Sequence, residues 1–160
     1  MVYASFCRPD RDVTDYRTQI TGIAEADLID APSVRVVREE VRQILDKEEV
    51  VIVGHGLDHD LAALELTHVP PPERLRDLAL YPRLMSLDAE QRLWPASLPD
   101  LAFEHLDITT EDWRGMFVLH DPVADAWCAM KVFLEYGEEW EARLRGGATH
   151  SPTDLTPLQA

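Results

Sequence analysis

An uninterrupted run of β-branched residues, Val-Val-Ile-Val at positions 50–53, stands directly before the glycines Gly54 and Gly56. A strand of this composition is typical of a parallel sheet whose two faces are covered by helices. The glycines allow the chain to turn sharply after the strand, and Asp58 is a candidate cap for a helix over residues 59–66. A strand, a tight turn and a helix in this order predict an α/β fold.

The rest of the chain supplies further elements around this unit. Ser33 is a suitable N-cap for a helix through about residue 46, and Ser97 and Asp121-Pro122 begin two more helices, the second of which ends at Gly146. Residues 2–7 are predicted as a strand, 8–33 as a connecting stretch, 75–80 as a strand around Asp77 and 85–95 as ambiguous. The buried stripe of the last helix is predicted to contain Ala126, Ala129, Met130, Phe133 and Trp140.

Length and charge limit the function classes. The 160 residues, 46% of them hydrophobic, are enough for one globular domain, which we expect over residues 1–145 with a flexible tail over 146–160. Fifteen basic residues against 30 acidic ones give a net charge of −15, which repels polyanions at long range. General nucleic-acid affinity is therefore disfavoured unless basic residues cluster locally.

Cysteine usage and hydropathy indicate the compartment. Cys7 and Cys128 are far apart in the sequence, which favours two reduced thiols in an intracellular protein over a disulfide framework. No apolar stretch approaches the length of a membrane-spanning helix, so we expect no membrane partner.

Two short motifs carry residues suited to catalysis. Residues 54–61 (Gly-His-Gly-Leu-Asp-His-Asp-Leu) follow the strand, and residues 120–126 (His-Asp-Pro-Val-Ala-Asp-Ala) open the last helix. Asp60 lies close behind a strand end, and His120 lies five residues ahead of a second carboxylate, Asp125. Carboxylates that meet in space hold divalent ions, and a nearby histidine activates a water, so this pattern suits metal-dependent phosphodiester hydrolysis.

Three stretches together resemble a known family. They are residues 13–18 (Val-Thr-Asp-Tyr-Arg-Thr) with 20–23 (Ile-Thr-Gly-Ile), residues 53–57 with 60–61, and residues 120–123 with 125–126. In this order they resemble the DEDDh 3′–5′ exonucleases, and within them the eukaryotic RNA-exonuclease branch that contains RNA exonuclease 4. The resemblance extends over residues 2 to about 136. It implies a ribonuclease-H-like α/β fold and a nuclear location, although the chain has no basic cluster that would direct it to the nucleus.

The resemblance also implies roles for particular residues. Asp60 corresponds to the carboxylate of the family's second motif, Asp125 to a metal ligand of the third, and His120 to the general base that activates the attacking water. The family uses two ions, Mg²⁺ or Mn²⁺, and cleaves RNA or single-stranded DNA. Residues of the glycine-containing motif are expected to contact substrate; they are His55, Gly56 and Leu57.

The chain departs from the family at its beginning. The family carries an Asp-x-Glu motif on its first strand, whereas this sequence begins where the family's third strand is expected, so roughly 30–40 residues, or two strands, are predicted to be missing. Smaller departures are Ala124 in place of Glu and Leu78 in place of Thr. We therefore expect an incomplete two-metal site with impaired activity, and a sheet that is completed by a homodimer, by a partner strand, or by re-pairing within the chain.

Each motif also has a plainer explanation. Asp60 and Asp125 are both explained as acids in the first turn of a helix, and Asp58 and Asp121 as helix caps rather than substitute ligands. A zinc site at His55 and His59 is disfavoured because closed zinc sites require about four ligands. Three hypotheses for the whole chain stay open: an exonuclease, a non-catalytic module that binds a protein or a nucleic acid, and the product of an incomplete gene sequence without independent function.

Overall fold

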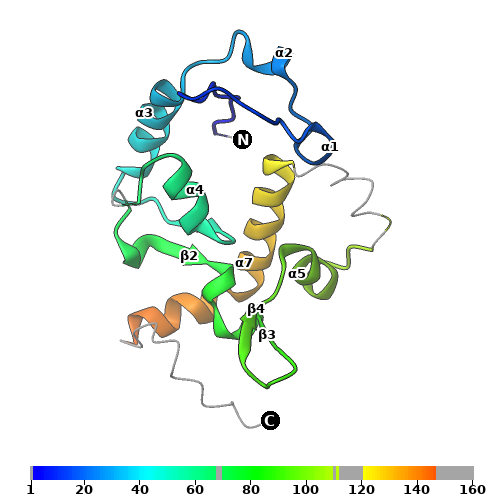
Figure 1. Ribbon diagram of the computed structural model, residues 1–160. Coiled ribbons are helices and arrows are strands. Elements are labelled where there is room, and N and C mark those ends of the chain that lie inside the picture. Colours follow the sequence, from blue (N-terminus) through cyan, green and yellow to red (C-terminus); the bar gives the residue numbers. More distant parts are fainter. Residues whose placement is uncertain (1, 68–69, 110, 112–120, 147–160) are drawn as a thin grey trace.

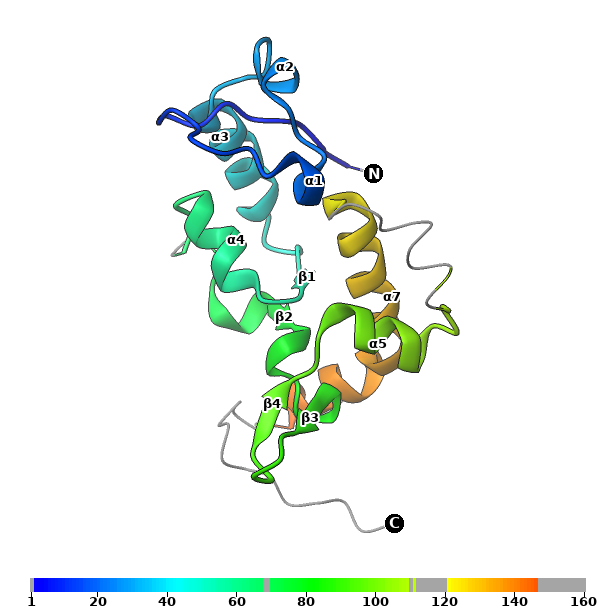
Figure 2. The same cartoon turned by 45° about the vertical axis from the view of Figure 1, so that its right-hand side comes forward.

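The computed structural model describes residues 2–67, 70–109, 111 and 121–146. Its helices are α1 (Thr18–Thr21), α2 (Glu25–Leu28), α3 (Val34–Leu45), α4 (Leu57–Ala63), α5 (Leu98–His105) and α7 (Pro122–Arg145), and its strands are β1 (Ile52–Gly54), β2 (Leu75–Asp77), β3 (Met85–Leu87) and β4 (Leu93–Pro95). Single 3₁₀ turns at Pro72–Arg74, Leu78–Leu80 and Pro82–Leu84 flank β2. Helices α3 and α4 lie on one side of β1 and β2, with α7 and α5 on the other (Figure 1; Figure 2).

The central parallel pair confirms the predicted α/β character. β1 pairs with β2 in parallel, with Gly54 opposite Asp77 at the ends of the strands. The observed strand begins two residues later than the predicted run, and Val51 is 43% exposed, so the run is only partly covered. A first cluster of buried leucines (Leu45, Leu57, Leu61 and Leu66) joins α3 and α4 to this pair.

The larger core lies between α7, α5 and the 3₁₀ turns after β2. Tyr81 stacks on Trp140 with their ring centroids 4.1 Å apart and their planes 8° from parallel, and both side chains are almost completely buried. Leu78, Leu101 and Val132 complete the centre of this core. The ambiguous stretch 85–95 forms the antiparallel hairpin β3–β4, which leads into α5.

The predicted strand over residues 2–7 is wrong. This stretch forms no strand, and Val2 and Phe6 are 90% and 53% exposed. A strand needs a neighbour that bonds along its length, and here the only β-type contact is an isolated parallel bridge between Arg8 and Ser33. The connecting stretch 8–33 contains the single-turn helices α1 and α2, which were not expected from the sequence.

Helix starts were predicted better than helix faces. Ser97 and Asp121 are N-caps whose side chains accept backbone N–H groups, as expected. On α7, however, Met130 is 42% exposed and Ala126 is exposed, whereas Cys128 and Val132 are completely buried. The predicted stripe therefore mixed residues from two faces of the helix. Within the described residues, none of the helices combines the length and the apolar character that a bilayer span requires.

Candidate active site

The Gly-His-Gly turn, residues 54–56, connects β1 to α4 and is held by Asp77 at the end of β2. Gly56 has φ +73°, a left-handed conformation that glycine adopts without strain, and it is the N-cap residue of α4. The Asp77 carboxylate accepts the N–H groups of Gly56 at 2.8 Å and Leu57 at 2.9 Å. Helix α4 therefore begins two residues earlier than predicted. Its capping carboxylate is that of Asp77 in β2 and not that of Asp58.

The same turn is held from a second direction. The Nε2 atom of His55 lies 2.8 Å from the carbonyl oxygen of Ala96, the residue before the N-cap of α5. At Gly54, an added Cβ would lie 2.4 Å from Cδ2 of Leu57, so no larger residue fits without a shift. The side chain of His55 thus joins two parts of the fold, and its predicted contact with substrate stays a prediction, as do those of Gly56 and Leu57.

Asp60 lies in the first turn of α4, and its carboxylate is under the influence of other acids. Partial desolvation by the surrounding protein raises the pKa of Asp60 above its ordinary value, and the negative charges of Asp77, Asp58 and Asp125 raise it further. Parallel strands that end at one edge of a sheet commonly place functional groups there. The two predicted metal ligands, Asp60 and Asp125, lie in the first turns of α4 and α7, and the charge of Asp125 is a minor contributor to the raised pKa of Asp60.

Asp125 is delivered by the first turn of α7. Asp121 caps this helix by accepting the N–H of Val123 at 2.9 Å, which confirms its interpretation as a cap. Asp125 is partly buried on the side of the helix that also carries Cys128, whose thiol pKa is raised first by burial and then by the charge of Asp125. The predicted general base, His120, lies outside the described residues.

A cluster of side chains that could hold a metal ion is not found among the residues that the structure describes. They contain no group of three or more His, Cys, Asp or Glu side chains that could hold a metal ion. Two Asp-x-Glu sequences do occur, at residues 46–48 and 88–90. The first begins at the C-cap of α3, where Asp46 pairs with Arg42, and the second lies in the β3–β4 hairpin. Neither lies on a strand.

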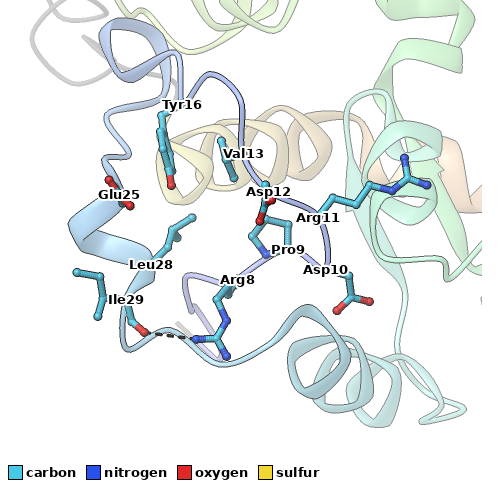
Figure 3. Close-up of a pocket in the computed structure, with 10 residues that line it drawn as sticks. All are labelled: Arg8, Pro9, Asp10, Arg11, Asp12, Val13, Tyr16, Glu25, Leu28 and Ile29. Carbon is cyan, nitrogen blue, oxygen red and sulfur yellow. Dashed lines mark hydrogen bonds between the residues drawn. The ribbon is translucent and has the colours of Figure 1, made fainter.

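A surface cavity of about 240 Å³ lies apart from these groups, in the segment that precedes α3. Figure 3 shows its mixed lining, in which Arg8 donates a hydrogen bond to the carbonyl of Ile29 at 3.4 Å. None of the predicted site residues lines it; the lining consists of Arg8, Pro9, Asp10, Arg11, Asp12, Val13, Tyr16, Glu25, Leu28 and Ile29. Its two arginines are offset by three carboxylates, so it is not a simple anion site.

Curated relatives match most of this chain. It is 29% identical over 157 residues to the apoptosis-enhancing nuclease of Rattus norvegicus, covering 98% of this chain and 45% of the relative. It is 37% identical over 144 residues to RNA exonuclease 4 of Mycosarcoma maydis, covering 90% and 36%, and 31% identical over 144 residues to RNA exonuclease 4 of Homo sapiens, covering 90% and 31%. The chain thus spans between about a third and a half of the length of these relatives.

Solved structures confirm the fold. The catalytic unit of Neurospora crassa Pan2, with protease and nuclease domains, superposes with a TM-score of 0.59 at 22% identity, covering 88% of this chain and 21% of that one. The Saccharomyces cerevisiae Pan2 module in complex with AAGGAA RNA gives 0.56 at 23%, covering 87% and 24%. These likenesses agree with the ribonuclease-H-like α/β fold. The sequence model of the exonuclease family matches residues 2–133, and the chain belongs to that family.

Proposed function

We propose that this chain is a 3′–5′ exonuclease domain that hydrolyses phosphodiester bonds of RNA or single-stranded DNA with Mg²⁺ or Mn²⁺. The observation that carries the proposal is the placement of Asp60 and Asp125 in the first turns of α4 and α7, where the charge of Asp125 makes a minor contribution to the raised pKa of Asp60. Because the chain belongs to the exonuclease family, we infer that these two carboxylates hold the divalent ions. The relatives named RNA exonuclease 4 favour RNA as the substrate.

The residues present are of the chemical type that binds a divalent ion. Carboxylate oxygens are the ligands that Mg²⁺ and Mn²⁺ prefer. Desolvation and then the negative charges of neighbouring acids raise the pKa of Asp60, and a bound cation would offset the repulsion from those acids. When bound, such ions activate water and neutralise the leaving oxygen. In this proposal Asp60 and Asp125 hold the ions and orient substrate, and His120 takes the proton from the attacking water.

The number of ligands sets the expected strength of the site. Hard divalent ions with about one protein carboxylate each are bound weakly, and two like charges close together repel each other. With Asp60 and Asp125 as its carboxylates, the chain is expected to need millimolar metal and to cleave slowly. Impaired activity is thus part of the proposal.

A non-catalytic role is the second candidate. It is favoured by the lack of a metal-holding cluster among the described residues and by the net charge of −15, which repels phosphate backbones and favours a protein partner. Within the described strands β1 pairs on one side only, with β2, so completion of the sheet by a second copy or a partner strand stays a prediction. The mass of the protein in solution tests it. A nuclear location also stays a prediction, which rests on the family likeness alone.

The deciding experiment compares matched variants on a 5′-labelled single-stranded RNA with Mn²⁺. Asp60→Asn and Asp125→Asn are expected to abolish stepwise shortening, because each removes one of the two proposed ligands. Asp58→Asn is the control, since Asp58 lies in the same first turn of α4 and its side chain is 78% exposed. An equal loss in the control would show that general charge matters and not the proposed ligands.

A second measurement separates binding from catalysis. A ligand that binds only the native state stabilises it in proportion to the logarithm of its concentration above Kd. The wild-type chain is expected to melt at a higher temperature as Mn²⁺ rises, and Asp60→Asn to respond less. Folded protein that neither cleaves RNA nor responds to Mn²⁺ would reject the enzyme and leave the binding module.

A further inference from the structure

Asp77 is a buried carboxylate that the proposed chemistry does not use. It is 9% exposed and belongs to the last position of β2, directly opposite Gly54 in the parallel register. One of its oxygens, Oδ1, accepts the N–H of Gly56 at 2.8 Å and of Ala79 at 3.0 Å, and the other, Oδ2, accepts the N–H of Leu57 at 2.9 Å. Both oxygens therefore accept hydrogen bonds from backbone amides.

This pattern requires a carboxylate. An ionised Asp only accepts hydrogen bonds, so each oxygen can face an N–H donor, whereas an Asn in the same place would direct its own NH₂ group at one of the amides. Backbone N–H groups that are buried without a partner are costly, and those of Gly56 and Leu57 stand at the start of α4, where a helix offers them no acceptor. Asp77 is thus the acceptor that allows the Gly-His-Gly turn to close.

The way in which the Gly-His-Gly turn is held determines where Asp60 lies. Leu57 is the first residue of α4, and Asp60 follows it by three residues in the same short helix. Helix α4 has only seven residues, and Gly56 at its start has a left-handed backbone. The direction of the Asp60 side chain therefore depends on how the backbone of residues 56 and 57 is held. The His55 bond to Ala96 fixes the other side of the turn but does not contact the helix amides.

We propose that Asp77 is a positioning residue of the active site: by holding the amides of Gly56 and Leu57 it fixes the start of α4 and thereby aims Asp60 at the metal. The proposal rests on the proposed function. Loss of a group that orients a metal ligand typically weakens metal binding by about 10–100-fold. Asp77 acts on Asp60 only through the backbone of α4, so we expect a loss of metal affinity at the lower end of this range.

The test compares Asp77→Asn with Asp88→Asn, a matched control. Asp88 also collects three donors, the N–H groups of Glu90 at 3.0 Å and Arg92 at 2.8 Å and the Nε of Arg92 at 2.8 Å, but it lies in the β3–β4 hairpin. The measurements are amide hydrogen exchange over residues 54–61 and the Kd for Mn²⁺. A third protein, Asp77→Asn combined with Asp60→Asn, shows whether Asp77 acts through Asp60.

Asp77→Asn is expected to speed exchange over residues 54–61 and to raise the Mn²⁺ Kd by about tenfold. Asp88→Asn is expected to do neither. In the Asp60→Asn background, Asp77→Asn is expected to change the Kd less than about twofold, because a positioning residue has no effect once its ligand is gone. A full loss of affinity in that background, or unchanged exchange over residues 54–61, overturns the proposal.

Two further results keep the test decisive. In the unaltered protein the amides of Gly56, Leu57 and Ala79 are expected to be protected although none has a backbone acceptor in a helix or strand, and rapid exchange at these three overturns the proposal even if Asp77→Asn does not fold. If the unaltered protein binds no Mn²⁺, the proposed function fails, and exchange over residues 54–61 alone decides whether Asp77 holds the turn.

Discussion

The ion pair between Arg76 and Glu141 links β2 to the second half of α7, and its loss should be measurable in the stability of the whole domain. Arg76 is bound in a bidentate manner, with Nε and Nη2 at 2.6 and 3.0 Å from the two carboxylate oxygens. The Arg76 side chain is 5% exposed and that of Glu141 34%. Glu141→Gln removes the negative charge and one of the two acceptors while keeping the shape of the side chain.

The expected loss follows from this burial. Breaking a buried pair costs about 3–5 kcal/mol, and exposed pairs contribute about 0–1 kcal/mol. Since one partner is buried, the other is a third exposed, and Gln keeps one acceptor, we expect Glu141→Gln to lower the free energy of unfolding by about 2–3 kcal/mol. In a domain of this size that corresponds to a fall in Tm of about 5–10 °C.

Urea titration at pH 7 measures this loss, and Glu139→Gln on the same helix is the control. Glu139 pairs with Arg83 and Arg143, all three side chains being 35–47% exposed, so its loss should be about 1 kcal/mol or less. Equal losses in the two variants would refute the argument from burial.

The pH dependence of the same pair gives a second check. The hydrogen bond from Arg76 lowers the pKa of Glu141 below its ordinary value of 4.5. A carboxylate with a lowered folded pKa contributes its stability above the unfolded value and loses it as the pH falls through the folded value. The gap between wild type and Glu141→Gln should therefore be complete at pH 7 and close as the pH falls below 4.5. A gap that persists in acid would contradict this assignment.

Three further substitutions or probes test other parts of the fold. Trp140→Ala should lower the free energy of unfolding by about 3–5 kcal/mol, measured by urea titration, because the side chain is 1% exposed in the main core. Gly54→Ala should be destabilising by about 1–3 kcal/mol, because its Cβ would lie 2.4 Å from Leu57, and a neutral result in thermal melts would contradict the packing. Burial raises the pKa of the Cys128 thiol to about 11, so a thiol reagent at pH 8 should label Cys7 in the native protein and both cysteines only after unfolding, as mass spectrometry would show.

Local signals in the sequence predicted the starts of α5 and α7 well. The N-caps Ser97 and Asp121, each followed by proline, lie where the structure begins α5 and α7. These signals work because a cap acts within three residues of the group that it satisfies. The strand over residues 2–7 failed for the opposite reason, since a strand exists only when a neighbour pairs with it, and alternation of side chains does not reveal the neighbour.

The roles of the candidate site residues stay predictions. The motif around Asp60 and the motif around Asp125 were identified from sequence, and the structure places both residues in the first turn of a helix. Asp77 was seen only as part of a strand, because its partners at positions 56 and 57 lie about 20 residues away and leave no local pattern. His120 lies outside the described residues, so its role stays a prediction.

The cap that Asp77 provides to α4 also bears on the order of folding. A seven-residue helix is too short to persist alone, and its capping carboxylate arrives only when β2 pairs with β1. We therefore expect α4 to form after the long α7 in refolding, and to open together with β2 as one cooperative unit in native-state exchange. Mutations in this unit would then accelerate unfolding more than they slow folding.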